Sequence, residues 1–294
     1  MKIFSPAKIN FFLHVRGKRP DGYHELFSLM CRINLLDEIS LQVGGPRSGP
    51  VEIFCSHPQV PADSTNLAHR AACLFQSQLN TARGIKIDLI KHIPVGAGLG
   101  GGSSNAASVL LALNTYYGHP FSPEHLMKMG LKLGADVPFF IFQKPAIATG
   151  IGEKLQPFEG DLRYHILLLN PGFSVSTAEV YQNLNFGLTK GKKQPTTKYF
   201  KRNRFNPSDH LTNDLERVTA LKYPEIGLAK EKLLNLGAVG ALMSGSGPTV
   251  FGLFDNADTA QTAKQTLSFD NEGKDLQVFL TDPILDADFK LIER

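Results

Sequence analysis

The glycine-rich stretch at residues 94–104, PVGAGLGGGSS, holds the residue types that most directly suggest chemistry. Six of the seven residues from Gly96 to Gly102 are Gly or Ala, and Ser103 and Ser104 open a helical pattern. The backbone amides of such a loop and the positive end of the following helix can face an anion together. A purely structural turn with a serine cap is the alternative, but so many glycines cost conformational entropy without a packing return. We therefore interpret the stretch as a polyphosphate-binding loop.

Three better-known glycine or serine motifs do not fit this stretch. Gly96, Gly98 and Gly101 form a GxGxxG, but the next element is a second helix rather than the strand and acidic residue of a dinucleotide-binding fold. A P-loop would need Lys where Gly102 stands. A hydrolase nucleophile elbow would place Ser104 directly at a strand end, and here a long loop intervenes.

The elements that must position this loop show alternating strand and helix patterns. Residues 8–15 alternate with a period of two, which predicts a strand with one buried face and with Lys8 and Asn10 together on the other face. The remaining predicted strands are 35–43, 51–54, 85–89, 146–149, 165–170, 276–281 and two strands joined by SGSGP at 244–248. The predicted helices are 67–79, 104–117, 123–133, 176–184, 213–221, 226–236 and 257–267.

Length and composition indicate a globular protein of two domains. The chain has 294 residues, of which 42% are hydrophobic and 20% charged. The polar, turn-rich segment at 155–164 predicts a boundary, and we place the domains at 1–158 and 159–294. The net charge of +4 suits an anionic ligand but falls short of a nucleic-acid footprint.

Other features of the sequence favour a cytoplasmic protein without a membrane segment. The three cysteines form no CxxC, and an odd number argues against a disulfide framework. Lys8 and Asn10 interrupt the apolar N-terminus, and no run reaches membrane-spanning length. One segment, 189–205, carries seven basic residues and no acid. We interpret it as a solvated loop, with contact to phosphate or nucleic acid as the alternative.

The motifs together resemble a known family. PVGAGLGGGSSNAA is similar to the PxxxGLGGSSA signature of the GHMP kinases, SPAKINFFLHV resembles their first motif, and SGSGPTVFGLF resembles their third. All three occur in the family's order across nearly the whole chain. KINFFLHVRGKRPDGYHEL and LGADVPFF further resemble the branch that phosphorylates a cytidine diphosphate-linked methylerythritol in non-mevalonate isoprenoid synthesis.

This resemblance implies a fold and a reaction. The fold is α/β (α+β), with an N-terminal domain like domain 2 of ribosomal protein S5, a C-terminal ferredoxin-like domain and a cleft between them. The reaction is ATP-dependent phosphorylation of the 2-hydroxyl of the cytidine diphosphate-linked substrate. The expected cofactors are ATP and Mg²⁺. No nucleic-acid partner and no membrane are expected, and the oligomeric state stays open between a monomer and a weak dimer.

The resemblance also implies roles for individual residues. Asp136 in GADVP matches the catalytic aspartate, and Lys8 in PAKIN matches the catalytic lysine. Asn10, Tyr23 and His24 match residues that hold the substrate, with His24 at the cytosine edge. Tyr181 matches the aromatic residue that stacks on cytosine. The residues that match the ATP phosphate loop are Pro94, Val95, Gly96, Ala97, Gly98, Leu99, Gly100, Gly101, Gly102, Ser103 and Ser104.

General chemistry supports these roles, although each residue also has a simpler interpretation. Phosphoryl transfer requires positioning and charge neutralisation, which Lys8 would supply, while Asp136 would accept the hydroxyl proton late in a loose transition state. A Lys–Asp pair would keep Asp136 ionised. Alternatively, Lys8 is a solvated strand lysine, Asp136 a helix cap, His24 a turn residue and Tyr181 a core residue.

The sequence shows no protein metal cluster, because no HExxH is present and the nine histidines have no metal-ligand spacing. We expect Mg²⁺ to arrive with ATP and Ser104 to contact it. Alternative functions are another GHMP kinase of the homoserine or mevalonate type, and a non-catalytic phosphate- or RNA-binding protein.

Overall fold

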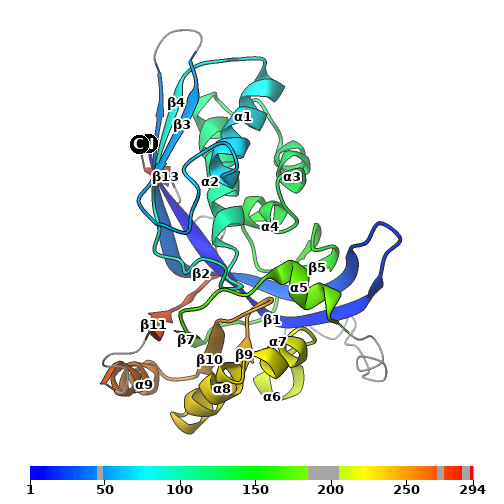
Figure 1. The fold of residues 1–294 in the computed structure, drawn as a ribbon, viewed down its shortest axis with the longest axis vertical. Helices are drawn as coiled ribbons and strands as arrows, with labels where there is room; N and C mark the ends of the chain where they lie inside the picture. Colours follow the sequence, from blue (N-terminus) through cyan, green and yellow to red (C-terminus); the bar gives the residue numbers. More distant parts are fainter. Residues whose placement is uncertain (45–48, 185–204, 270–274, 287–291, 294) are drawn as a thin grey trace.

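The computed structural model describes the chain except residues 45–48, 185–204, 270–274, 287–291 and 294. The described part is elongated, with one sheet and its helices at each end (Figure 1). None of its helices is both long and apolar enough to cross a membrane. All but the last residue of the basic segment 189–205 lies outside the described residues, so its interpretation stays a prediction.

The larger sheet is built around two long antiparallel strands. Its strand order is β13-β1-β2-β4-β3, with β5 and β12 on β2, β6 on β5 and β8 on β1. The strands are β1 (Lys2–Lys18), β2 (His24–Val43), β3 (Val51–Cys55), β4 (Ile85–Ile90), β5 (Ala146–Gly150), β6 (Lys154–Pro157), β8 (Thr212–Asn213), β12 (Pro283–Ile284) and β13 (Ile292–Glu293).

Helices α1 (Leu67–Leu79), α2 (Gly101–Tyr116), α3 (Pro123–Leu131) and α4 (Val137–Phe142) pack with the larger sheet (Figure 1). Local sequence sets their ends. Asn66 caps α1 by accepting a hydrogen bond from the amide of Ala68, and Ser122 caps α3 in the same way through the amide of His125. Asn80 ends α1 in the left-handed conformation, at φ 52°.

The smaller sheet is antiparallel, in the order β11-β7-β10-β9. Its strands are β7 (His165–Asn170), β9 (Gly240–Met243), β10 (Val250–Phe254) and β11 (Gln277–Thr281). The helices of this half are α5 (Thr177–Gln182), α6 (Pro207–His210), α7 (Glu216–Lys222), α8 (Glu225–Asn235) and α9 (Ala257–Phe269). The two-part α/β fold expected from the sequence is confirmed.

The expectation of one buried face on the first strand is wrong. Every residue from Ser5 to Val15 is buried, including Lys8 at 4% exposure and Asn10 at 3%. The reason is that β1 lies between the two layers, so its second face is covered as well (Figure 1). A register shift between Asn10 and Phe12 also places Phe11 and Phe12 in the same core.

Several elements escaped the sequence patterns, among them the short elements β6, α6, β8, β12 and β13. Helix α4 is a short continuous apolar run, VPFFIF, which has no polar face to give a helical period. The first half of β2, from His24 to Asn34, is mostly buried on both sides and therefore shows no alternation. Helix α2 begins at Gly101, three residues before the predicted start.

The chain crosses back between the halves. Strands β8, β12 and β13 follow residue 158 in sequence, yet they join the larger sheet. We therefore propose 1–158 and 159–294 as a division of the two sheet cores, with three short strands returning from the second part to the first.

Candidate active site

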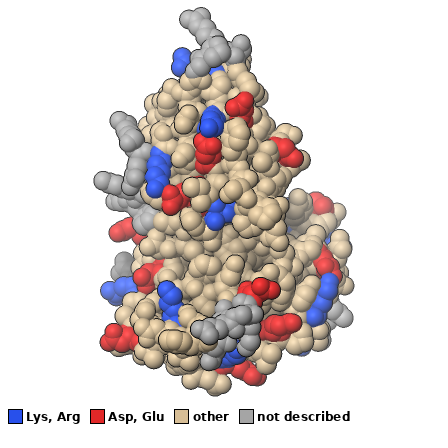
Figure 2. Space-filling view, turned by 60° about the vertical axis from the view of Figure 1, so that its left-hand side comes forward, with Lys and Arg blue, Asp and Glu red and all other residues tan. Residues whose placement is uncertain are grey.

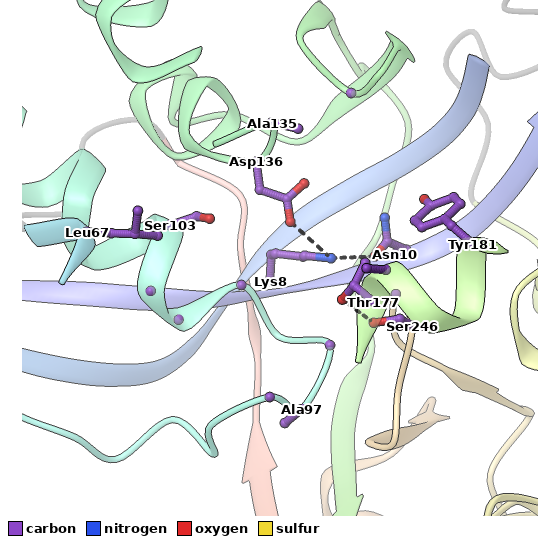
Figure 3. A pocket seen from close by; sticks show the side chains of 18 of the residues that line it. Lys8, Asn10, Leu67, Ala97, Ser103, Ala135, Asp136, Thr177, Tyr181 and Ser246 are labelled. Carbon is purple, nitrogen blue, oxygen red and sulfur yellow. Dashed lines mark hydrogen bonds and ion pairs between the residues drawn. The ribbon is translucent and has the colours of Figure 1, made fainter. Parts of the chain in front are cut away.

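A cavity of about 850 Å³ brings the predicted site residues together. Its lining includes Lys8, Asn10, Tyr23, His24, Asp136 and Tyr181, and every predicted loop residue except Leu99 and Ser104. The Lys8–Asp136 pair lies in the middle of the close view, with Ser103 and Leu67 on one side and Tyr181 on the other (Figure 3). The cavity therefore has two ends with a charged pair between them.

The glycine loop is fixed through its carbonyl groups. Gly96, Gly98 and Gly100 have positive φ values of 64°, 76° and 71°, which turn successive peptide groups. Five consecutive carbonyls accept hydrogen bonds from outside the loop: Val95 from Ser174 Oγ at 3.1 Å, Gly96 from Val175 N at 3.2 Å, Ala97 from Thr249 N at 3.4 Å, Gly98 from Ser244 Oγ at 3.0 Å and Leu99 from Lys8 N at 2.9 Å.

The amide groups of the same loop are left available. Within the described part of the chain, no hydrogen bond is found that the amides of residues 96–103 donate. The cap residue of α2, Gly100, offers no side chain, and the first turn of the helix has no acidic residue. The free amides and the positive helix end therefore give the loop an arrangement that can bind an anion.

Lys8 is held between an amide and a carboxylate. Its Nζ donates to Asn10 Oδ1 at 2.7 Å and lies 3.7 Å from Asp136 Oδ2 (Figure 3). Asn10 Nδ2 in turn donates to Ser28 Oγ at 2.8 Å, which fixes the orientation of the amide. Lys8 is therefore a buried, ordered cation rather than a solvated strand lysine.

Asp136 stands at the cap position of α4 but makes no capping hydrogen bond with its side chain. The carboxylate points toward Lys8 instead (Figure 3), and its side chain is 36% exposed. The helix-cap interpretation therefore does not explain this residue. A partly exposed carboxylate beside a buried ammonium is an arrangement that can hold a hydroxyl group and accept its proton.

Aromatic side chains form the other end of the cavity. The rings of His24 and Tyr181 stack with centroids 5.0 Å apart and planes 24° apart. Burial, and then the charge of Lys18, lower the pKa of His24, whereas burial and the charge of Asp136 raise the pKa of Tyr181. A neutral His24 offers one ring donor and one ring acceptor, which suits the edge of a base. Tyr23 is 57% exposed at the cavity rim.

Two predicted loop residues lie elsewhere. Leu99 packs in the apolar core, and Ser104 is fully buried with an Oγ that has no hydrogen-bond partner and does not line the cavity. Because α2 begins at Gly101, Ser104 falls on the core face of the helix, and Ser103 lines the cavity in its place. This position does not favour the expected contact of Ser104 with Mg²⁺, which stays a prediction.

Several cavity residues were missed by sequence reasoning. Thr177 Oγ1 and Ser246 Oγ are 2.8 Å apart and join α5 to the loop between β9 and β10 (Figure 3). Lys18 and Lys91 also line the cavity. Ser246 could have been found, since it stands in the SGSGP segment, whereas Thr177 and the lysines carry no local signal.

Comparison with known proteins places the chain in a family. Models of the GHMP kinase N-terminal and C-terminal domains match residues 66–144 and 198–272. A 4-diphosphocytidyl-2-C-methyl-D-erythritol kinase of Syntrophotalea carbinolica is 49% identical over 264 residues, covering 90% of this chain and 93% of that protein. One from Geobacter sp. strain M21 is 47% identical, covering 90% and 92%.

Solved structures agree with these matches. A crystal structure of 4-(cytidine 5'-diphospho)-2C-methyl-D-erythritol kinase matches with a TM-score of 0.79 and 34% identity, covering 96% of this chain and 99% of that one. Homoserine kinase from Cytophaga hutchinsonii matches with a TM-score of 0.75 at 18% identity, covering 98% and 96%, and so shares the fold. This chain belongs to the GHMP kinase family, and within it to the branch of the 4-diphosphocytidyl-2-C-methyl-D-erythritol kinases.

Proposed function

We propose that the chain transfers the γ-phosphoryl group of ATP to the 2-hydroxyl of 4-diphosphocytidyl-2-C-methyl-D-erythritol, giving the 2-phosphate and ADP. The observation that carries this proposal is one cavity with an anion-binding loop at one end, a His–Tyr stack at the other and a Lys–Asp pair between them. A kinase of a nucleotide-linked alcohol needs these three parts in this order.

The central pair acts on the hydroxyl group. Asp136 accepts the proton of the 2-hydroxyl group while the oxygen of that hydroxyl bonds to the γ-phosphorus of ATP. The bond between the γ-phosphorus and the bridging oxygen breaks, and ADP leaves. Lys8, whose Nζ lies 3.7 Å from Asp136 Oδ2, neutralises the negative charge on the phosphoryl group during its transfer. Asn10 fixes the ammonium group, so little reorganisation is needed during transfer.

The glycine loop holds the phosphates of ATP. Its free amides replace the hydrogen bonds that the phosphate oxygens make with water, and α2 adds the positive end of its dipole. The apolar side chains of Val60, Pro61 and Leu67 also line the cavity and offer contact surface for the adenine ring.

The cavity fits a magnesium ion that arrives with ATP. Its lining offers one carboxylate, Asp136, and the hydroxyl of Ser103, and the described residues contain no group of three or more side chains that could hold a metal ion alone. Mg²⁺ usually takes only one or two protein ligands and completes its shell with phosphate and water. When bound, the ion supplies charge neutralisation between the phosphates, with Ser103 as its proposed protein contact.

The aromatic end selects the cytidine part of the substrate. Neutral His24 can donate to and accept from the cytosine edge, and Tyr181 offers a face for stacking. A homoserine or mevalonate kinase needs no such base-binding end.

A non-catalytic RNA-binding function has less support. On the face shown in Figure 2, Lys and Arg side chains are interspersed with Asp and Glu rather than gathered into one basic surface. That hypothesis also leaves the Lys8–Asp136 contact inside a cavity without a purpose. It predicts salt-dependent binding of RNA without release of ADP.

The test is release of ADP from Mg-ATP with the cytidyl substrate, with mevalonate and homoserine as matched alcohols. We expect release with the cytidyl substrate alone. Release with a control alcohol alone would reject the base-binding end and keep the kinase, and no release with any of the three would reject the kinase function.

A further inference from the structure

Asp37 is a fully buried carboxylate that does not line the cavity. It lies in β2, and both of its oxygens are used. Oδ1 accepts from the amides of His92 at 2.8 Å and Ile93 at 2.9 Å. Oδ2 accepts from Asn105 Nδ2 at 2.9 Å and from Lys91 Nζ. A buried charge is tolerated only with such complete hydrogen bonding, so these four hydrogen bonds are what allow the carboxylate to be buried here.

The four donors belong to the two ends of the nucleotide loop. Residues 91–93 follow β4 and lead into the loop, and Asn105 lies in the second turn of α2, directly after the loop. Lys91 Nζ also donates to Asn105 Oδ1 at 3.1 Å, which adds a second link between the ends. Asp37 therefore joins the strand that enters the loop to the helix that leaves it.

The charges of this cluster also favour a joint role. The side chain of Lys91 is nearly buried, and its Nζ would be only 3.1 Å from a methyl group placed on Gly101, the first residue of α2. An ammonium group beside the positive end of a helix is unfavourable by itself. Asp37 offsets both positive charges and lets the lysine and the helix end approach each other.

We propose that Asp37 is a positioning residue for the nucleotide: it fixes the two ends of the loop so that the amides of residues 96–103 keep the arrangement that binds the phosphates, without touching the nucleotide itself. This inference rests on the proposed function, because it assigns the loop to ATP. Holding a site in its binding geometry improves affinity mainly by removing the cost of ordering it during binding.

The test compares Asp37→Asn with a matched control, Asn114→Ala. The oxygen of the amide introduced by Asp37→Asn could still accept from the amides of His92 and Ile93, but its NH₂ group would then face Lys91 Nζ and Asn105 Nδ2, which are donors themselves. Asn114 is also buried in α2, at its far end, where it bonds the amide and carbonyl of Phe121. Loss of Asn114 is expected to lower Tm without moving the nucleotide loop.

Two readouts separate positioning from stability. The first is steady-state kinetics, in which Asp37→Asn should raise KM for ATP about tenfold or more and change KM for the alcohol substrate less than about twofold. The second is amide hydrogen exchange at Val175 and Thr249, which donate to the loop carbonyls and do not touch Asp37. Without nucleotide, exchange there should be at least about fivefold faster than in Asn114→Ala.

Each outcome decides the question. An unchanged KM for ATP together with unchanged exchange would reduce Asp37 to a structural residue, and tighter ATP binding would show that it holds Lys91 away from the phosphates. If Asp37→Asn does not fold, Asn105→Ala removes the hydrogen bonds that Asn105 makes with Asp37 and Lys91 and leaves those of Asp37 to residues 91–93. It must then raise KM for ATP and speed up exchange in the same way, but by less. Should wild-type protein release no ADP, the exchange comparison still tests the positioning role on its own.

Discussion

The two ends of the cavity recognise their ligands by different means. The phosphate end is made of backbone amides, and their positions follow from five bonded carbonyls and from Asp37. The base end is made of side chains, of which Tyr23 is 57% exposed at the rim, near the turn between β1 and β2. The first end therefore depends on one backbone arrangement, whereas the second can lose a side chain and keep its shape.

The centre of the cavity, between the two ends, should give the largest effect. We expect Asp136→Asn to lower kcat about a thousandfold, since an amide cannot accept the hydroxyl proton, while the KM values for both substrates change little. Steady-state kinetics with Mg-ATP and the cytidyl substrate measure this. A kcat within about tenfold of wild type would show that another group takes the proton.

The phosphate end should be intolerant of any side chain at its turns. A methyl group on Gly98 would meet the carbonyl oxygen of Ser244 at 2.1 Å, and the residue has φ +76°. We expect Gly98→Ala to abolish measurable saturation with ATP or to raise its KM at least about a hundredfold, because the loop must move.

The matched control for that substitution is Gly118→Ala. Gly118 has a similar φ of +75° but open space around it, and it lies outside the cavity. It isolates the cost of the left-handed backbone, about 1–2 kcal/mol of unfolding free energy. Equal KM values for ATP in the two variants would mean that the collision with Ser244 is unimportant.

The base end should respond in a graded way. We expect Tyr181→Ala to raise KM for the cytidyl substrate about tenfold through lost stacking, and Tyr181→Phe to change it less than about twofold because the ring remains. The KM for ATP should not change in either variant. If KM for ATP rose together with KM for the cytidyl substrate, the two ends would be coupled and would not bind their ligands independently.

The smallest effect should come from pH. The pKa of His24, whose ring stacks on Tyr181, is lowered by burial and by the charge of Lys18. The ring is therefore neutral at pH 7. As pH falls below about 6.5 and through the lowered pKa, protonation removes the ring acceptor and KM for the cytidyl substrate should rise.

The lowered pKa of His24 also affects the free energy of unfolding. The unfolded chain binds the His24 proton at a higher pH than the folded chain, so unfolding free energy decreases as pH falls through this range. The measurement is KM from pH 8 to pH 5 in wild type and in His24→Gln, which should lack the rise. An identical pH profile in both proteins would exclude His24 as its source.

The sequence predicted the residue types of the site better than their surroundings. The glycines from 96 to 102 and Ser103 could be assigned to an anion site because the groups that bind the anion belong to the local backbone. The burial of Lys8 could not be predicted, since it depends on a second layer that covers β1. Asp37 was missed because its donors stand 54 to 68 residues away along the chain. Contacts between residues so far apart in sequence produce no periodic pattern of residue types.

The return of β13 to the larger sheet also bears on how this protein is made. Residues Lys2 and Ile3 pair with Glu293 and Ile292, so one edge of β1 has no strand partner there until residues 292 and 293 have left the ribosome. An unpaired strand edge can pair with another chain in the meantime. Synthesis therefore leaves this early strand exposed while nearly 300 residues are added. Deletion of residues 292–294 should reduce the soluble yield more than it reduces the activity of the molecules that fold.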